Sequence, residues 1–135
     1  MIKKINHIGI AVKNLDDAVK QYQKLGFTVD RIEDMPELKC RMAFLPVGEA
    51  LLELIEPMGE GAATQYLETH GEGIHHICYE VDDIDEAFAT IGAALPIRDP
   101  APTIGAGNSR VFFMRPENLC NVETEFVEMP KEDNE

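Results

Sequence analysis

The chain contains two stretches in which an alternating hydrophobic and polar pattern is followed by a pattern of helical period. The first opens with "INHIGIAV" and becomes helical over 15–25, and the second opens with "IHHICYEV" and becomes helical over 84–93. Alternation predicts a half-buried β-strand, and apolar residues three and four positions apart predict an amphipathic helix. Asn14 and Asp83 stand directly before the helical patterns, where a side-chain oxygen can cap the first turn. Each stretch therefore predicts a strand, a capped start and a helix.

The two stretches are copies of one sequence. When the chain is shifted by 69 positions, residues 5–19 fall on residues 74–88, and six of the fifteen positions are identical. Three further positions are close substitutions, among them Leu15 with Ile84. Self-similarity at a fixed offset indicates a duplicated structural unit. We therefore expect two modules of the same fold.

Further strands are predicted after each helix, three in each half of the chain. They cover 27–33, 39–47 and 50–57 in the first half, and 94–98, 109–116 and 121–128 in the second. We expect an α+β fold in which two tandem βαβββ modules form a curved eight-stranded mixed sheet with helices on the convex side. The concave face of such a sheet is suited to a small ligand.

The domain organisation follows from this repeat. We expect a first module over 1–57, a linker over 58–72, a second module over 73–129 and an acidic tail over 130–135. The linker contains the short helical pattern "ATQYLETH", which glycines bound on both sides. The modules share one core, so the whole chain reads as one domain.

Composition and charge exclude several classes of protein. With 135 residues, 44% of them apolar and 27% charged, the chain has the make-up of an ordinary globular domain. No apolar run approaches the roughly 20 residues that cross a bilayer, and we expect no signal peptide in "MIKKINHIGIAV". The net charge of −13 repels nucleic acid and anionic membranes, so we expect neither as a partner. Three widely spaced cysteines indicate a reducing cytoplasm rather than a disulfide framework: Cys40, Cys78 and Cys120.

Two adjacent histidines in "GIHHICYEV" point to opposite faces of the predicted strand. Under the repeat offset His76 matches His7, whereas His75 matches Asn6. The duplication therefore predicts that His7 and His76 occupy equivalent places. For either residue alone, a hydrogen-bonded core histidine is the alternative.

Each module also ends in a matching glutamate. "ELIEP" and "EFVEM" share the phrase Glu-apolar-apolar-Glu and align Glu53 with Glu125 at an offset of 72. An ionised glutamate inside an apolar strand is costly to bury unless a cation compensates it. Two imidazoles and two carboxylates suit a divalent ion such as Co, Zn, Mn, Ni or Mg. The sequence predicts a metal site of His7, Glu53, His76 and Glu125, and a solvent-facing edge glutamate is the alternative for either carboxylate alone.

With these residues, the chain resembles the vicinal oxygen chelate superfamily, which includes glyoxalase I, extradiol dioxygenases, antibiotic-resistance proteins and methylmalonyl-CoA epimerase. The resemblance is strongest to the epimerase branch. It runs from "INHIGIAVKNLDDAVKQYQKLGF" through "LLELIEP" and "GEGIHHICYEVDDID" to "PTIGAGNSRVFFMRP". The most discriminating part is "IGAG" followed by Arg-Val-x-Phe.

The resemblance implies a divalent cofactor held by His7, His76 and Glu125, with Glu53 where relatives use Glu or Gln. It implies an isomerase that interconverts the (2R) and (2S) forms of methylmalonyl-CoA, or of a related acyl-CoA, through α-proton abstraction and an enolate. Glu125 is then the first candidate for the base, and Glu53 is its pseudo-symmetric partner. The family also suggests a homodimer.

The chain departs from the epimerase pattern in two places. Some relatives carry a further catalytic Glu on the third strand, near Met42, where "CRMAFL" has no carboxylate. Near the C-terminus Arg115 replaces the usual His, Cys120 and Asn121 replace a Gly-Gly pair, and Glu123 takes a normally apolar strand position. By alternation Glu123 shares a face with Glu125, where it either adds a base or disturbs the site by repulsion.

Two other functions fit the same resemblance. A glyoxalase I-type lactoylglutathione lyase uses the same metal chemistry, and a bleomycin-resistance-type protein binds its ligand without turnover. Substrate assays separate the first from an epimerase, and loss of bound metal on purification favours the second. The basic residues that can meet CoA phosphates, or are ordinary surface charges, are Lys39, Arg41, Arg98, Arg110 and Arg115.

Overall fold

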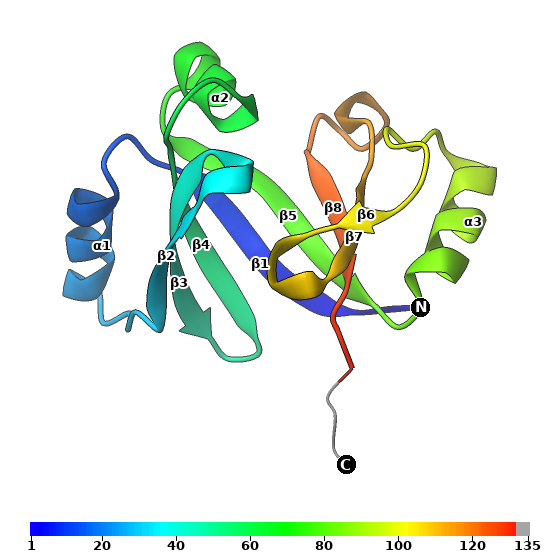
Figure 1. Cartoon of the computed structure of the whole chain (residues 1–135), viewed down its shortest axis with the longest axis horizontal. Coiled ribbons are helices and arrows are strands. Elements are labelled where there is room, and N and C mark those ends of the chain that lie inside the picture. The colour runs from blue at the N-terminus through cyan, green and yellow to red at the C-terminus, as the bar shows by residue number, and fades with distance from the viewer. Residues whose placement is uncertain (132–135) are drawn as a thin grey trace. The chain divides into compact units, whose positions relative to one another are not determined.

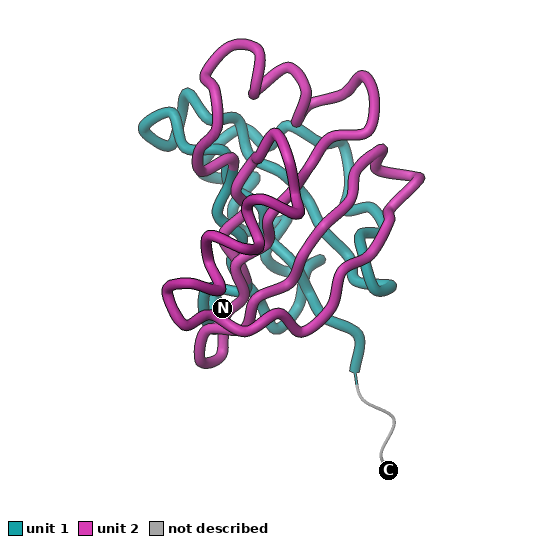
Figure 2. Tube along the Cα trace, turned by 90° about the vertical axis from the view of Figure 1, so that its left-hand side faces the viewer, with its two compact units in different colours: residues 1–6, 76–135 teal, residues 7–75 magenta. Residues whose placement is uncertain are grey.

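The computed structural model describes residues 1–131, so residues 132–135 of the predicted acidic tail lie outside the described residues. It divides into two compact units, which Figure 2 shows in teal and magenta. Unit 1 contains residues 1–6 and the chain from His76 onward, and unit 2 contains residues 7–75. The predicted module boundaries along the chain stay a prediction.

Unit 2 contains one repeat of the predicted βαβββ order (Figure 1). Its strands have the order β2-β3-β4-β1, with β1 and β4 parallel and the other neighbours antiparallel. Helix α2 follows β4 at the place of the helix predicted in the linker. The elements are β1 (Ile2–Ala11, whose first residues belong to unit 1), α1 (Leu15–Lys24), β2 (Arg31–Met35), the short 3-10 helix η1 (Pro36–Leu38), β3 (Cys40–Val47), β4 (Ala50–Pro57) and α2 (Ala62–His70).

Unit 1 repeats this order. Its strands follow β1 in the order β5-β8-β7-β6, and β5 and β8 are parallel, as β1 and β4 are in unit 2. The described chain thus has eight strands in a mixed sheet of two βαβββ repeats, which confirms the predicted α+β fold. The elements are β5 (Gly73–Val81, whose first three residues belong to unit 2), α3 (Ile84–Ala94), β6 (Thr103–Ile104), η2 (Ala106–Asn108), β7 (Arg110–Phe113), η3 (Pro116–Asn118) and β8 (Thr124–Glu128).

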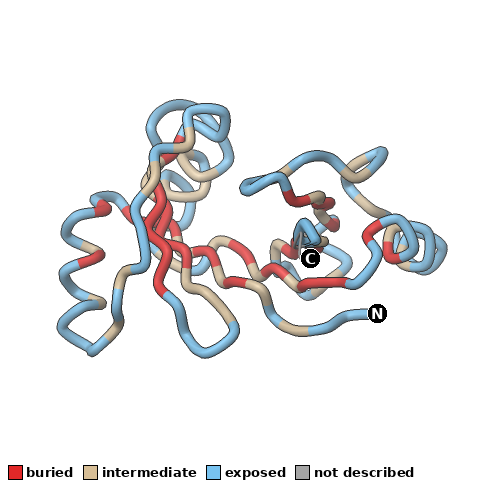
Figure 3. Tube along the Cα trace, turned by 60° about the horizontal axis from the view of Figure 1, so that its bottom comes forward, coloured by how far each residue is buried: buried red, intermediate tan, exposed pale blue. Residues whose placement is uncertain are grey.

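The helix of each unit packs against one face of the strands of that unit. In unit 2 the buried residues Leu15 and Val19 of α1 meet Leu54 of β4, and in unit 1 Ile84 of α3 meets Phe126 of β8. Figure 3 shows the buried residues concentrated along the strands. Because side chains alternate across a strand, the residues between these positions lie on the opposite face of the sheet. We call that opposite face the site face of each unit.

The helix starts confirm the predicted caps and add a second one. The Asn14 side chain accepts a hydrogen bond from the backbone N–H of Asp17, and the Asp83 side chain accepts one from Glu86. The last glutamate of each Glu-apolar-apolar-Glu phrase also reaches a helix start. Glu56 Oε1 accepts from the Leu15 N–H and Glu128 Oε1 accepts from the Ile84 N–H, both at 2.8 Å. These carboxylates satisfy N–H groups that a helix start leaves without an intrahelical partner.

Replacing Glu56 with alanine is expected to lower the free energy of unfolding by about 1–2 kcal/mol, because a charge-assisted bond to the helix start is lost. Glu56→Gln keeps an acceptor oxygen and should lose less. Urea unfolding followed by circular dichroism measures the effect. Glu60→Ala, at an exposed position after β4, is the control, and equal loss in the two alanine variants would contradict the capping role.

Two predicted strands lie elsewhere in the structure. The strand expected over 94–98 is wrong: α3 continues to Ala94, and this stretch contributes one isolated bridge, between Ile97 and Met114. Pro96 lacks the N–H that a strand ladder needs, and the strand that pairs with β7 on the side away from β8 is β6. The strand expected over 27–33 begins at Arg31, because the Phe27 N–H bonds back to the Tyr22 carbonyl of α1.

Candidate metal centre

Unit 2 brings the first predicted histidine to its glutamate. His7 Nδ1 lies 3.3 Å from Glu53 Oε2, and both residues are 8% exposed. The parallel pairing of β1 with β4 places Glu53 opposite Gly9, two residues beyond His7. Gly9 has no side chain, so no side chain of β1 stands directly opposite Glu53.

Unit 1 builds the same pair from the other copy of the repeat. His76 Nε2 lies 3.3 Å from Glu125 Oε1, and the two residues are 8% and 9% exposed. The parallel pairing of β5 with β8 places Glu125 opposite Cys78, again two residues beyond the histidine. The glutamates are offset by 72 positions, whereas the histidines are offset by 69. The three extra residues of the second repeat therefore lie between its histidine and its last strand, and each glutamate keeps the same register relative to its histidine.

The spacing within each pair fits two ligands of one metal ion. Zinc–nitrogen and zinc–oxygen bonds of about 2.0–2.2 Å at a tetrahedral angle put the two donor atoms about 3.4 Å apart. A direct N–H···O hydrogen bond is usually shorter, near 2.9–3.0 Å. Burial adds to this, because ionised carboxylates are rarely buried without a partner. The donor chemistry and spacing of each pair therefore fit a divalent ion.

Few polar side chains share this burial. Within residues 1–131 the buried polar or charged residues are His7, Glu53, His76, Glu80, Ser109, Thr124 and Glu125. Four of these seven are the residues predicted from the sequence repeat. His75 is not among them, and its ring instead makes an edge contact with Tyr66 of α2 at 5.2 Å between ring centroids.

Cys40 lies on the site face of unit 2 in one buried cluster with Met42 and Phe44. Burial raises the pKa of the Cys40 thiol, and the negative charge of Glu53 raises it further. The protonated thiol is thus favoured in the folded protein. The stability that the folded protein gains from the protonated Cys40 thiol is fully present below the ordinary thiol pKa. It is lost as the pH rises through the raised pKa of Cys40 in the folded protein. Met42, where the sequence has no carboxylate, fills this cluster as an apolar side chain.

We expect iodoacetamide at pH 8 to alkylate Cys40 at least about tenfold more slowly than the exposed Cys120, because the reactive species is an accessible thiolate. Cys78 is also buried and serves as a second slow site in the same sample. Peptide mass spectrometry over time measures all three rates. Alkylation of Cys40 as fast as Cys120 would show that its burial does not protect it.

Each unit also carries an arginine stacked on a phenylalanine of its site face. The sequence did not predict this matching pair of arginines. In unit 2 the guanidinium carbon of Arg31 lies 4.0 Å from the ring centroid of Phe44, and Phe44 is paired with Glu53 across β3 and β4. In unit 1 the guanidinium carbon of Arg98 lies 4.5 Å from the ring centroid of Phe113, which is paired with Glu125 across β7 and β8. We call each set an arginine–phenylalanine platform.

A signal for the platforms exists in the sequence, although it is weak. Phe44 and Phe113 are separated by the histidine offset of 69, whereas Arg31 and Arg98 are separated by 67. The two arginines therefore do not align when the chain is shifted by one fixed number. Only the structure shows that each stacks on the phenylalanine across from its glutamate.

Glu123 forms an ion pair with Arg98. Its Oε2 lies 2.8 Å from Arg98 Nη1, and its backbone carbonyl accepts a hydrogen bond from the Ile77 N–H, beside His76. An ion pair with Arg98 offsets the negative charge two residues before Glu125. The negative charge of Glu123 is therefore compensated by Arg98 rather than acting only as repulsion on Glu125.

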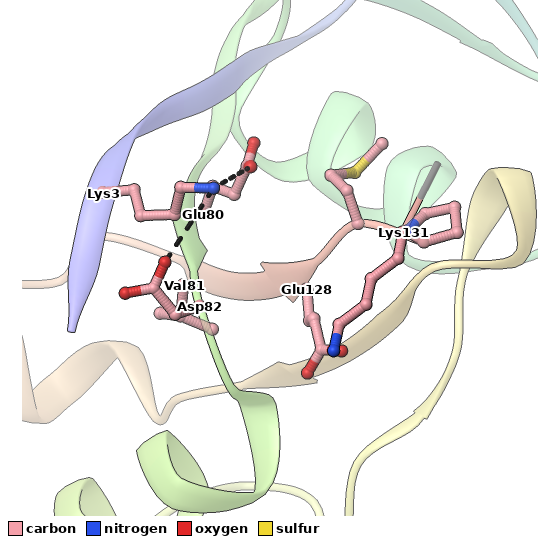
Figure 4. A pocket seen from close by; sticks show the side chains of 8 residues that line it. Lys3, Glu80, Val81, Asp82, Glu128 and Lys131 are labelled. Atoms are coloured by element: carbon pink, nitrogen blue, oxygen red, sulfur yellow. Dashed lines mark ion pairs between the residues drawn. The ribbon is translucent and has the colours of Figure 1, made fainter. Parts of the chain in front are cut away.

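A polar pocket of about 390 Å³ lies elsewhere in unit 1 (Figure 4). Lys3 Nζ lies 3.4 Å from Glu80 and 3.9 Å from Asp82, and these ion pairs are drawn in the figure. The Asn6 side chain also donates to Glu80. Because these charges compensate one another, Glu80 has a structural explanation, and the pocket lining includes neither His76 nor Glu125.

"IGAGNSR" forms the turn between β6 and β7, and η2 rather than an α-helix follows it. Gly105 is required there, because a Cβ atom would lie 2.9 Å from both Ser109 Oγ and a methyl group of Val111. The Gly105 N–H donates to the Ser109 carbonyl and closes the turn. A helix that would hold a dinucleotide phosphate is therefore absent from this described turn.

The paired βαβββ repeats and the matched His–Glu pairs define the class of protein. Residues 6–118 match the model of the Glyoxalase/Bleomycin resistance protein/Dioxygenase superfamily, and the chain belongs to this superfamily. None of the helices within residues 1–131 has the length and apolar character that crossing a lipid bilayer requires.

Within this superfamily the chain is similar to epimerases of acyl-CoA thioesters. It is 38% identical to the ethylmalonyl-CoA/methylmalonyl-CoA epimerase of Cereibacter sphaeroides over 94% of this chain and all of the relative. A variant of the Streptomyces coelicolor methylmalonyl-CoA epimerase, solved with 2-nitronate-propionyl-CoA, matches all of both chains with 31% identity and a TM-score of 0.89. A hypothetical protein of Bacillus halodurans matches 98% of both chains with 32% identity and a TM-score of 0.91.

Proposed function

We propose that this protein is a metal-dependent epimerase that interconverts the (2R) and (2S) forms of methylmalonyl-CoA or a related acyl-CoA. One observation carries the proposal: each repeat buries a histidine and a glutamate 3.3 Å apart, in a chain that is similar over 94% of its length to such an epimerase. The reaction removes and returns one proton at the carbon between a thioester and a carboxylate. This chemistry needs carboxylates at a site that also stabilises negative charge.

We infer that the two pairs serve one divalent ion, whose identity stays open among Co, Zn, Mn, Ni and Mg. A single His–Glu pair supplies two donor atoms, whereas a protein metal site commonly uses three or four. The equivalent register of both pairs supports a joint set of His7, Glu53, His76 and Glu125. A bound divalent ion would supply positive charge for the developing enolate.

In the proposed reaction, Glu125 takes the α-proton, and the electron pair of the broken C–H bond remains in the enolate. Glu53, in its protonated form, returns a proton to the opposite face of the same carbon. The reverse reaction exchanges these roles. One of the two carboxyls is protonated when substrate or product is bound, both are protonated while the enolate is present, and the total number of protons does not change. His7 and His76, each 3.3 Å from its glutamate, hold the carboxylates in position. Met42 offers no third carboxylate on β3, which leaves Glu53 of β4 and Glu125 of β8 as the acid–base pair.

α-Hydrogen exchange in deuterated water tests this function. The metal-loaded protein is incubated with (2S)-methylmalonyl-CoA, and the deuterium content and configuration of the thioester are followed by mass spectrometry and a stereospecific coupled assay. We expect incorporation at the α-carbon together with the opposite stereoisomer. No exchange with any of Co, Mn, Zn, Ni or Mg present would reject the epimerase.

The alternatives give different results in parallel assays. Conversion of the glutathione hemithioacetal of methylglyoxal, without exchange in the CoA ester, would identify a lactoylglutathione lyase. Binding without turnover of either compound would identify a ligand-binding protein of the bleomycin-resistance type. A cytoplasmic location and a homodimer stay predictions, which fractionation of the source cells and light scattering respectively address.

A further inference from the structure

The arginine–phenylalanine platform of unit 1 leaves part of its guanidinium available. Arg98 Nη1 contacts Glu123 at 2.8 Å, and Arg98 Nε lies 3.7 Å from Asp99. Arg98 Nη2 forms no hydrogen bond or ion pair with any residue between 1 and 131. The Arg98 side chain is 44% exposed. An arginine fixed by an aromatic ring on one side and by carboxylates on two nitrogens keeps a planar donor edge for another anion.

The position of this donor edge relates it to the site. Phe113 is paired with Glu125, and side chains directly opposite on antiparallel strands have Cβ atoms about 4.5–5.5 Å apart. Arg98 stacks on Phe113, so its guanidinium lies about one side chain away from Glu125 on the site face. A ligand group held at Glu125 can therefore extend to Arg98.

We propose that Arg98 is an anion-binding residue of the site and that Glu123 is its resident counter-ion, which lowers its affinity for the anion. The inference rests on the proposed function, because it assigns part of the acyl-CoA to this residue. Its ligand is an anionic oxygen group, either the acyl carboxylate or a phosphate of CoA. Both belong to a substrate that a chain with 25 acidic and 12 basic residues repels as a whole.

The repeat argues that this platform is not an isolated surface contact. Arg31 stacks on Phe44 in unit 2 in the same relation to Glu53, and Arg31 is also held by two carboxylates, those of Asp30 and Glu33. Two copies that differ at most positions both carry a cation on the aromatic ring that is paired with the site glutamate. An ion pair that only fastened a loop would have no reason to recur at that place.

The sharpest test compares variants of Arg98 and Glu123, because substrate affinity is expected to fall in one and rise in the other. Arg98→Ala should weaken malonyl-CoA binding to the metal-loaded protein about tenfold, because a charge-assisted hydrogen bond is lost. Glu123→Gln keeps an acceptor for Arg98 but removes its negative charge, so it should tighten binding a few-fold. A purely structural ion pair would instead give weaker binding or no change in both variants. Titration calorimetry measures the dissociation constants without requiring turnover.

Two further ligands identify the anion. Propionyl-CoA lacks the acyl carboxylate, and malonyl-pantetheine lacks the CoA phosphates. If Arg98 binds the carboxylate, Arg98→Ala weakens malonyl-pantetheine and leaves propionyl-CoA unchanged. If it binds a phosphate, the reverse holds. Unchanged affinity for all three ligands overturns the inference, and so does tighter binding by Arg98→Ala.

Controls separate this inference from the proposed function and from misfolding. Lys20→Ala removes one positive charge from an exposed position of α1 and should leave all affinities unchanged. The urea midpoint of each variant shows whether it is folded. Failure of the wild-type protein to exchange the α-hydrogen rejects the epimerase, whereas the calorimetric comparison still decides whether Arg98 binds an anion.

Discussion

Replacing His76 with alanine is expected to remove stoichiometric divalent metal from the protein and to weaken metal affinity roughly a thousandfold. Replacing a residue that only supports a metal ligand typically lowers metal affinity 10–100-fold, and replacing a ligand itself lowers it further. His76 is buried, with Nε2 3.3 Å from Glu125, so its removal leaves that carboxylate without its neighbouring donor. Turnover should fall in parallel with bound metal.

The adjacent histidine provides a matched control. His75→Ala removes the same chemical group one position earlier, where the ring contacts Tyr66, and metal content should be unchanged. Elemental analysis after dialysis and titration against a competing chelator measure both variants. His7→Ala should behave like His76→Ala. Full metal occupancy in His7→Ala and His76→Ala, with both proteins folded, would refute the metal centre.

The second large effect is expected for Glu125. Glu125→Gln should reduce α-hydrogen exchange by about a thousandfold, because proton transfer by a positioned side chain contributes roughly 10²–10⁴-fold and an amide cannot accept the proton. Gln retains an oxygen that can still contact His76, so bound metal should fall less than in His76→Ala. The ratio of lost exchange to lost metal therefore separates a base from a ligand.

Deuterium incorporation into the thioester, measured alongside metal content, gives this ratio. Glu117→Gln, at an exposed position before β8, makes the same chemical change as a control and should exchange at the wild-type rate. Glu53→Gln is expected to impair return of the proton from the other face and so to slow inversion of configuration. Exchange in Glu125→Gln at the wild-type rate would assign the base to another group.

The elements that the sequence predicted correctly are those with strong local signals. Helices α1 and α3 begin at Leu15 and Ile84, directly after the predicted caps, because a side-chain oxygen and a helical apolar period are short-range properties. The prediction of a strand over 94–98 was wrong. The apolar end of α3 extends the helix to Ala94, and Pro96 has no N–H for strand pairing. Which segment then pairs with β7 depends on residues far along the chain.

The site shows the same division. The repeat placed a histidine and a glutamate in each module, since a duplication preserves the position of a residue on its strand. It did not reveal that Glu56 and Glu128 reach helix starts, or that Arg98 holds Glu123. These contacts join segments 25 to 44 residues apart, and their partners carry no common spacing in the sequence.

By itself the sequence determined the duplicated fold and the four chemical groups proposed for the metal, because periodicity and repetition are written along the chain. Only the tertiary structure decided the 3.3 Å approach within each His–Glu pair and the arginine that stacks on the phenylalanine opposite each glutamate. The physical reason is that strand register and side-chain stacking are set by packing between distant segments, which no local pattern of residues encodes.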